Sequence, residues 1–123
     1  PEQVLRAGAT ASTTMGGLEE SEAFRTNLGL CEIWGESATV RVTVFDAAMV
    51  ELGFQDTQLR PYENTQINQV AKTVAGASTL SNGVVEVTVT GGDGRIGAYL
   101  SVVDNATGDP TFIAIAPQSP AGG

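Results

Sequence analysis

Alternating hydrophobic and polar residues recur along most of this chain and predict β-strands. The clearest run is residues 38–46, where every second residue from Ala38 to Val44 is alanine or valine. A period of two places alternate side chains on opposite faces of a strand, and β-branched residues favour that geometry. Further runs of this kind lie at residues 23–33, 50–54, 83–90, 96–103 and 111–116.

One segment departs from the alternation and predicts a short helix near residues 65–75. Its apolar residues recur with the spacing of one helical face, at Ile67, Val70, Ala71 and Val74. Asn64 or Thr65 is expected to cap the N-terminus of this helix, and Gly76 is expected to end it.

Turn signals between the runs predict how the strands connect. Residues 34–37 join two alternating runs and predict an antiparallel hairpin, as does the glycine-rich turn at residues 91–94. Six to eight short strands with one short helix indicate an all-β fold, a two-sheet antiparallel β-sandwich of the immunoglobulin-like kind.

The same pattern divides the chain into three parts. Residues 23–116 form the predicted sandwich, and residues 117–123 form a Pro/Gly-rich tail. Residues 1–22 are interpreted as an N-terminal extension, with a possible donor strand at residues 3–10 and a glycine-containing loop at residues 13–17.

The last two predicted strands carry apolar residues on both faces, unlike a strand with one side in water. Because one sandwich covers only one of these faces, the other face favours a neighbouring molecule. A sheet edge can also accept a strand from another chain. The residues predicted to contact another subunit are Val4, Leu5, Cys31, Trp34, Tyr99, Phe112, Ile113 and Ile115.

Composition and charge narrow the classes of partner. The 123 residues suit one domain, and their formal net charge of −8 disfavours nucleic acid and anionic membranes as partners. Charged residues make up only 16% of the chain, and threonine, serine, asparagine and glycine replace them. No apolar run reaches the roughly 18 residues of a membrane helix. This composition indicates a protein that is secreted or held at the cell surface, with no membrane insertion.

The chain offers little of the usual chemistry of enzymes. It has no histidine, which excludes histidine-based catalytic triads and the commonest zinc ligand. We therefore expect no enzyme activity, no catalytic residues and no bound cofactor. The single cysteine, Cys31, cannot form an internal disulfide, which leaves a buried thiol, an intermolecular bridge or a reactive site.

Two weaker binding signals remain. The loop between the last two strands contains Asp104, Asn105 and Asp109, whose oxygen atoms suit Ca²⁺, although the same residues also stabilise turns. Trp34, Tyr62 and Tyr99 could form a platform for stacking sugar rings, or they could pack into the core or an edge. A glycan is therefore a possible partner.

Three stretches together resemble a family of domains found in secreted bacterial proteins. They are FRTNLGL at residues 24–30, PYENTQIN at residues 61–68 and SVVDNATGDPTF at residues 101–112. The resemblance implies an immunoglobulin-like β-sandwich and secretion, and it implies no catalytic residues. The segment Cys31–Trp34 departs from the family pattern, where a Pro/Asn/Ser-rich turn is expected.

These observations favour a non-enzymatic extracellular structural protein that assembles with copies of itself into a filament, tube or surface polymer. Strand addition and apolar contacts would join the subunits. The alternative is an accessory module of a secreted enzyme or adhesin that binds a carbohydrate or another protein.

Overall fold

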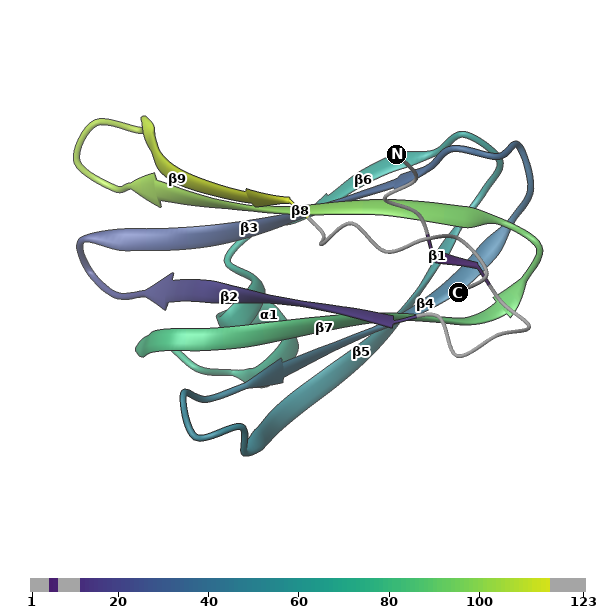
Figure 1. The fold of residues 1–123 in the computed structure, drawn as a ribbon. Helices are drawn as coiled ribbons and strands as arrows, with labels where there is room; N and C mark the ends of the chain where they lie inside the picture. Colours follow the sequence, from purple (N-terminus) through teal and green to yellow (C-terminus); the bar gives the residue numbers. More distant parts are fainter. Residues whose placement is uncertain (1–4, 7–11, 116–123) are drawn as a thin grey trace.

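Two antiparallel sheets face each other in the computed structural model, which describes residues 5–6 and 12–115, with side chains described for residues 12–110 (Figure 1). This arrangement confirms the predicted all-β, two-sheet sandwich. The elements are β1 Leu5–Arg6, β2 Ser12–Glu20, β3 Phe24–Glu32, β4 Ala38–Phe45, β5 Glu51–Leu59, β6 Asn64–Ile67, α1 Val70–Ala75, β7 Leu80–Gly92, β8 Arg95–Asp104 and β9 Pro110–Ile115.

The strand order is that of a jelly roll. Sheet A has the order β1-β8-β3-β6, with β9 also pairing with β8, and sheet B has the order β2-β7-β4-β5. In an immunoglobulin sandwich the first two strands are neighbours in one sheet, whereas β1 and β2 lie in different sheets here. Most connections therefore cross from one sheet to the other, as in jelly rolls. Within the confirmed sandwich class, this connectivity replaces the immunoglobulin-like one.

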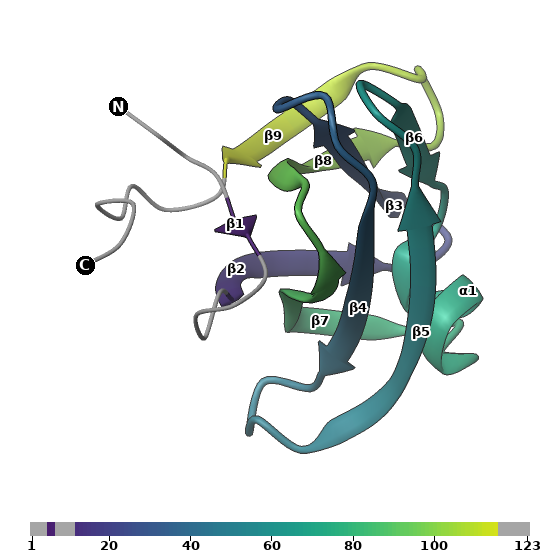
Figure 2. The same cartoon turned by 90° about the vertical axis from the view of Figure 1, so that its right-hand side faces the viewer.

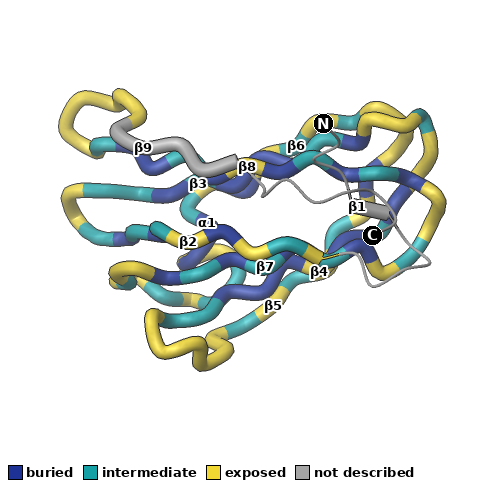
Figure 3. The backbone as a smooth tube through the Cα atoms, viewed as in Figure 1, coloured by how far each residue is buried: buried dark blue, intermediate teal, exposed yellow. Residues whose placement is uncertain are grey.

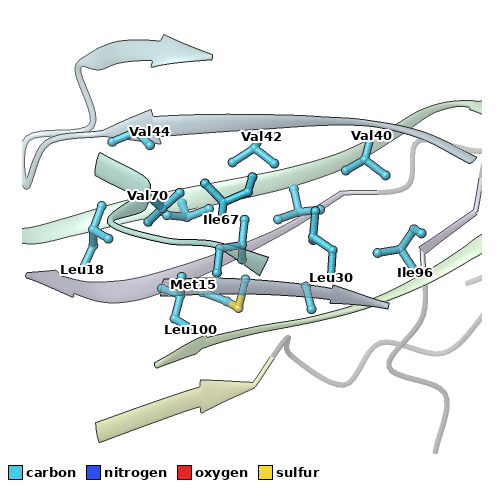
Figure 4. Close-up of a cluster of buried hydrophobic side chains, with 14 of the residues drawn as sticks. Met15, Leu18, Leu30, Val40, Val42, Val44, Ile67, Val70, Ile96 and Leu100 are labelled. Carbon is cyan, nitrogen blue, oxygen red and sulfur yellow. The ribbon is translucent and has the colours of Figure 1, made fainter. Parts of the chain in front are cut away.

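The core lies between the sheets and follows the predicted alternation. Val40, Val42 and Val44 of β4 have no exposed surface, and neither does Leu100 of β8 (Figure 4). Val85, Val87 and Val89 of β7 are buried on the same inner face of sheet B. Figure 3 shows the buried residues alternating with less buried ones along these strands.

Two predicted hairpins are wrong. Residues 34–37 and residues 91–94 each connect a strand of one sheet to a strand of the other, since β3 pairs with β6 and β8 while β4 pairs with β5 and β7. Alternation within a strand identifies its inner face but carries no information about its partner. A short turn therefore fits a sheet-to-sheet crossing as well as a hairpin.

The N-terminal part also differs from its prediction. The loop predicted at residues 13–17 is wrong, because β2 pairs with β7 and belongs to the sandwich rather than to an extension. The pairing register shifts on either side of Leu18, and Gly17 has a φ of 88°, so the glycines form irregularities within a strand. Of the donor strand predicted at residues 3–10, only β1 is described, and it pairs with β8 of the same chain.

The predicted helix is shorter than expected. Residues 64–67 form β6 in sheet A, so Asn64 and Thr65 are not helix caps, and α1 begins after Gln69, which has a left-handed φ of 48°. Gly76, with a φ of 68°, ends the helix as predicted, and its N–H donates to the carbonyl of Lys72. Ile67 belongs to β6 and is buried there, so it matched the apolar spacing of the predicted helix without being part of a helix.

Candidate functional site

The exposed large apolar side chains of the described residues form two groups at opposite ends of the sandwich. Ile33, Trp34 and Tyr62 lie on connections at one end, with Tyr99 nearby on sheet A. The second group, which we call the hairpin patch, consists of Met49, Val50, Leu52 and Phe54 at the β4–β5 hairpin. β4 and β5 are antiparallel, so their hairpin lies at the end opposite the connections after β3 and β5.

A buried carboxylate organises the first end. Glu32, which is only 1% exposed, follows Leu28 and Leu30 on the inward-facing side of β3. Its Oε1 accepts hydrogen bonds from the N–H groups of Gly35, Glu36 and Tyr62 at 2.6, 3.2 and 3.0 Å. Its Oε2 accepts from the N–H groups of Trp34 and Arg95, both at 2.9 Å. One side chain thus joins three connections that are distant in sequence.

These donors also set the charge state of Glu32. Burial by itself raises the pKa of the carboxyl, but the N–H groups of Tyr62, Arg95, Trp34 and Gly35 outweigh burial and lower it to about 2. Glu32 is therefore ionised at neutral pH. A perturbed carboxyl often marks an active site, but here both oxygens are already engaged with the backbone.

The connections held by Glu32 present aromatic rings. The guanidinium of Arg95 lies 3.5 Å from the centre of the Trp34 ring, which remains 54% exposed. The Tyr62 ring lies over Gly35, where a side chain would collide with it. Tyr62 has a φ of 59°, a left-handed conformation that costs about 1–3 kcal/mol in a non-glycine residue. Its N–H reaches Glu32 in this conformation.

An open groove of about 360 Å³ runs across the outer face of sheet A. It is lined by residues of β3, β6 and β8, among them Gly29, Cys31, Asn64, Gly97 and Tyr99. The Tyr99 ring lies across Gly29, its cross-strand neighbour, in the space that a side chain there would need. Cys31 is opposite Gly97 in the same sheet and is partly exposed.

The structure therefore brings together two of the predicted contact residues in the groove, and a third lies outside its lining. Cys31 and Tyr99 line the groove, and Trp34 lies beside Arg95 at the start of β8. Val4 and the side chains of Leu5, Phe112, Ile113 and Ile115 lie outside the described part of the chain. The outer side of β8 carries Gly97, Tyr99 and Ser101, so the apolar face predicted there is largely absent.

The predicted calcium residues have structural partners. Asp104 accepts a hydrogen bond from the N–H of Ala106 at 2.8 Å, and Asn105 accepts one from Arg25 at 2.8 Å. The amide of Asn105 also donates to the carbonyls of Ser21 and Glu22, which ties the β8–β9 loop to the β2–β3 loop. The structure brings no third acidic, cysteine or histidine residue to Asp104 and Asp109 among the residues it describes.

Sequence reasoning missed the hairpin patch. Asp46 forms the turn, since its Oδ1 accepts from the N–H groups of Ala48 and Val50 at 2.9 and 3.0 Å. Leu52 and Phe54 alternate with Glu51 and Gly53, but on β5 the apolar positions face outward. The sequence carried one signal. The alternate residues of β5 from Gln55 onward end at Leu59, which is buried, so that phase and not the phase of Leu52 and Phe54 faces the core.

A second buried carboxyl lies in β2. Glu20 is 3% exposed, and its Oε1 has no hydrogen-bond partner among the described groups. Burial raises the pKa of Glu20, and Gln69 and Lys72 offset part of this effect. The strand β2 turns this side chain inward.

Comparison with known structures supports the fold alone. The chain resembles the crystal structure of Thermotoga maritima 1070, with a TM-score of 0.67, 12% sequence identity, and coverage of 92% of this chain and 97% of that one. The Anabaena sensory rhodopsin transducer gives a TM-score of 0.49 at 11% identity, covering 70% of this chain and 90% of that one. No family model and no curated protein matches the sequence. Over the described residues, no helix is long and apolar enough to cross a membrane.

Replacing Glu32 with glutamine will destabilise the fold at neutral pH by about 3 kcal/mol, because an amide cannot accept from five N–H groups with both its polar atoms. The wild-type carboxyl has a lowered pKa, so its contribution is complete above about pH 4.5 and is lost as the pH falls toward about 2. Urea unfolding of the wild type and of Glu32→Gln across this pH range will show that the difference between their free energies of unfolding becomes smaller in acid. A constant difference would contradict the role of the charge.

The matching substitution at Glu20 will stabilise the fold instead of destabilising it. Glu20→Gln removes a buried charge with an unpaired oxygen, so it will raise the thermal midpoint at neutral pH. Because the pKa of Glu20 is raised, the wild-type carboxyl becomes protonated as the pH falls, and the advantage of glutamine will shrink. Thermal unfolding at neutral and mildly acidic pH measures this. A lower midpoint for the variant at neutral pH would show that Lys72 and Gln69 stabilise the charged form.

Proposed function

We propose that this protein is a non-catalytic extracellular structural protein that associates with copies of itself. The observation that carries the proposal is the hairpin patch. Its four side chains are between 38% and 56% exposed although all are apolar. Contiguous exposed apolar surface of this kind is characteristic of protein contact sites. The partly buried Phe45 and Val84, which face each other across β4 and β7, adjoin it on sheet B.

The charges beside the patch favour a second copy as its partner. Arg41 lies 4.2 Å from the centre of the Phe54 ring and forms a two-pronged ion pair with Asp56, at 2.8 and 3.1 Å. The pair lowers the pKa of Asp56 and raises that of Arg41, so both are charged at neutral pH. Because these two charges neutralise each other within one chain, the pair adds no net charge beside the apolar centre that would repel a second copy.

The face of β5, rather than its edge, is the proposed contact. β5 is an edge of sheet B, but α1 packs against it at Gly53, where an added side chain would meet Val74 and Ala75 (Figure 2). This contact covers the inner face of β5, whereas Leu52 and Phe54 on its outer face remain open to a partner.

A patch that pairs with itself closes at a dimer, so a filament, tube or surface polymer requires a second contact. The segments at residues 3–10 and 111–116 are the candidates from the sequence. Their described parts, β1 and β9, pair with successive parts of β8 within one chain. The same pairing between two copies would exchange strands without requiring a new type of contact.

Support for a non-catalytic role comes from the buried carboxyls. Glu32 is engaged by five backbone N–H groups, and Glu20 lies inside the fold. The acidic, lysine-poor composition supports an extracellular location.

Sedimentation equilibrium tests the association. The wild-type protein will form dimers or larger species as its concentration rises, and Phe54→Ser will weaken this because it removes apolar area from the contact. Added salt will strengthen the association, because it screens the repulsion between chains of net charge −8.

Tyr62→Ser is the matched control, since it removes an exposed aromatic ring at the opposite end of the sandwich and will leave the association unchanged. A wild-type protein that stays monomeric at high concentration and high salt would refute the proposal.

A further inference from the structure

The groove on sheet A has the construction of a ligand site separate from the hairpin patch. Its floor contains two glycines on neighbouring strands, Gly97 and Gly29, and the Tyr99 ring covers Gly29. Asn64 of β6 is exposed at one side, directly opposite Cys31 in the register. Most of the groove surface is apolar, with polar groups at a few positions, as in typical ligand sites.

Two exposed aromatic rings lie near this groove: Tyr99 lines it, and Trp34 lies outside its lining, beside Arg95. Tyr99 lies flat across Gly29 and is still 38% exposed, so its outer face is open. Trp34 is held by Arg95, which precedes Tyr99 by four residues on β8. At roughly 3.3 Å per residue, the backbone positions of Arg95 and Tyr99 are about 13 Å apart along β8. Rings that are already ordered lose little conformational freedom when a ligand binds.

The chemistry of this surface favours a sugar chain. The face of an aromatic ring carries negative charge density, and the C–H groups on one side of a pyranose ring are slightly positive, so the two stack. An extended peptide would instead bind through the hydrogen-bonding groups of a free strand edge, and of the three strands that line the groove only β6 is an edge strand. The chain's net charge of −8 disfavours acidic polysaccharides.

We propose that the groove at Tyr99, together with the surface that continues past Gly97 to Trp34, binds a neutral, unbranched oligosaccharide. One sugar stacks on each ring, and the units between them lie over Gly97 and Cys31 beside Asn64. A monosaccharide reaches only one ring, so affinity will increase with chain length. This inference does not depend on self-association, because it uses the opposite end and the other sheet.

Trp34 is the only tryptophan of the chain, so its fluorescence reports on the site directly. An array of neutral glycans is screened first, and the linkage that binds is then titrated as the hexasaccharide, the disaccharide and the monosaccharide. The emission of Trp34 will shift on binding, and the hexasaccharide will bind most tightly. Absence of binding to every neutral glycan on the array, with no emission change in cellohexaose or maltohexaose, would overturn the proposal.

Variants separate stacking from other effects. Tyr99→Ala will weaken binding by about tenfold, whereas Tyr99→Phe will retain it because the ring remains. Trp34→Ala, followed by calorimetry, will have a similar effect to Tyr99→Ala. Phe54→Ala, in the hairpin patch, is the control and will bind as the wild type does. Equal binding by Tyr99→Ala and the wild type would place the ligand elsewhere and contradict the proposal.

Cys31 gives a readout that needs no substitution. It is the only cysteine and lines the groove, so a maleimide reagent will modify the protein once and slowly. The bound hexasaccharide will protect Cys31 in proportion to its occupancy. Binding without protection would show that the sugar chain does not cross the groove floor.

Discussion

The ionised carboxylate of Glu32 is the constraint on which one end of the molecule depends. A jelly roll sends most of its connections from sheet to sheet, and the N–H groups of these connections have no strand to pair with. Glu32 satisfies five of them with one buried side chain. A neutral residue of the same size could not, because it would leave several donors unpaired inside the protein. The fold therefore retains a buried charge that its hydrophobic core alone would not favour.

The same carboxylate determines the surface above it. Gly35 and Tyr62 both have positive φ angles, and the N–H groups of both donate to Oε1. The carboxylate therefore holds both turns in left-handed backbone conformations. Glycine accepts this geometry freely, whereas Tyr62 does not. The strain at Tyr62 is offset by its hydrogen bond, and the bond keeps the ring over Gly35. The fixed position of the exposed Tyr62 ring is thus a consequence of the buried charge beneath it.

Particular residues show how far the sequence could predict this structure. The valines of β4 and β7 were enough to identify their strands and inner faces, because one strand's alternation is a local property. The partners of β3 and β4 depend on contacts between distant residues, and two hairpins were wrong for that reason. The alternation of β3 also pointed Glu32 inward, but a charged residue at that position was not recognised as a core residue. On β5, Leu52 and Phe54 were missed because their apolar phase faces outward.

The two candidate surfaces, the hairpin patch and the groove, differ in the contacts that hold them in place. The hairpin patch is formed within one hairpin, where Asp46 shapes the turn, so it requires few distant contacts. The groove requires three strands of sheet A in register, and Trp34 beside it requires the connection that Glu32 holds. Because these surfaces lie on opposite sheets and near opposite ends, a copy of the chain bound at one leaves the other accessible. A dimer formed through the hairpin patch would therefore carry two grooves, and weak sugar binding at each would combine into stronger attachment through multivalency.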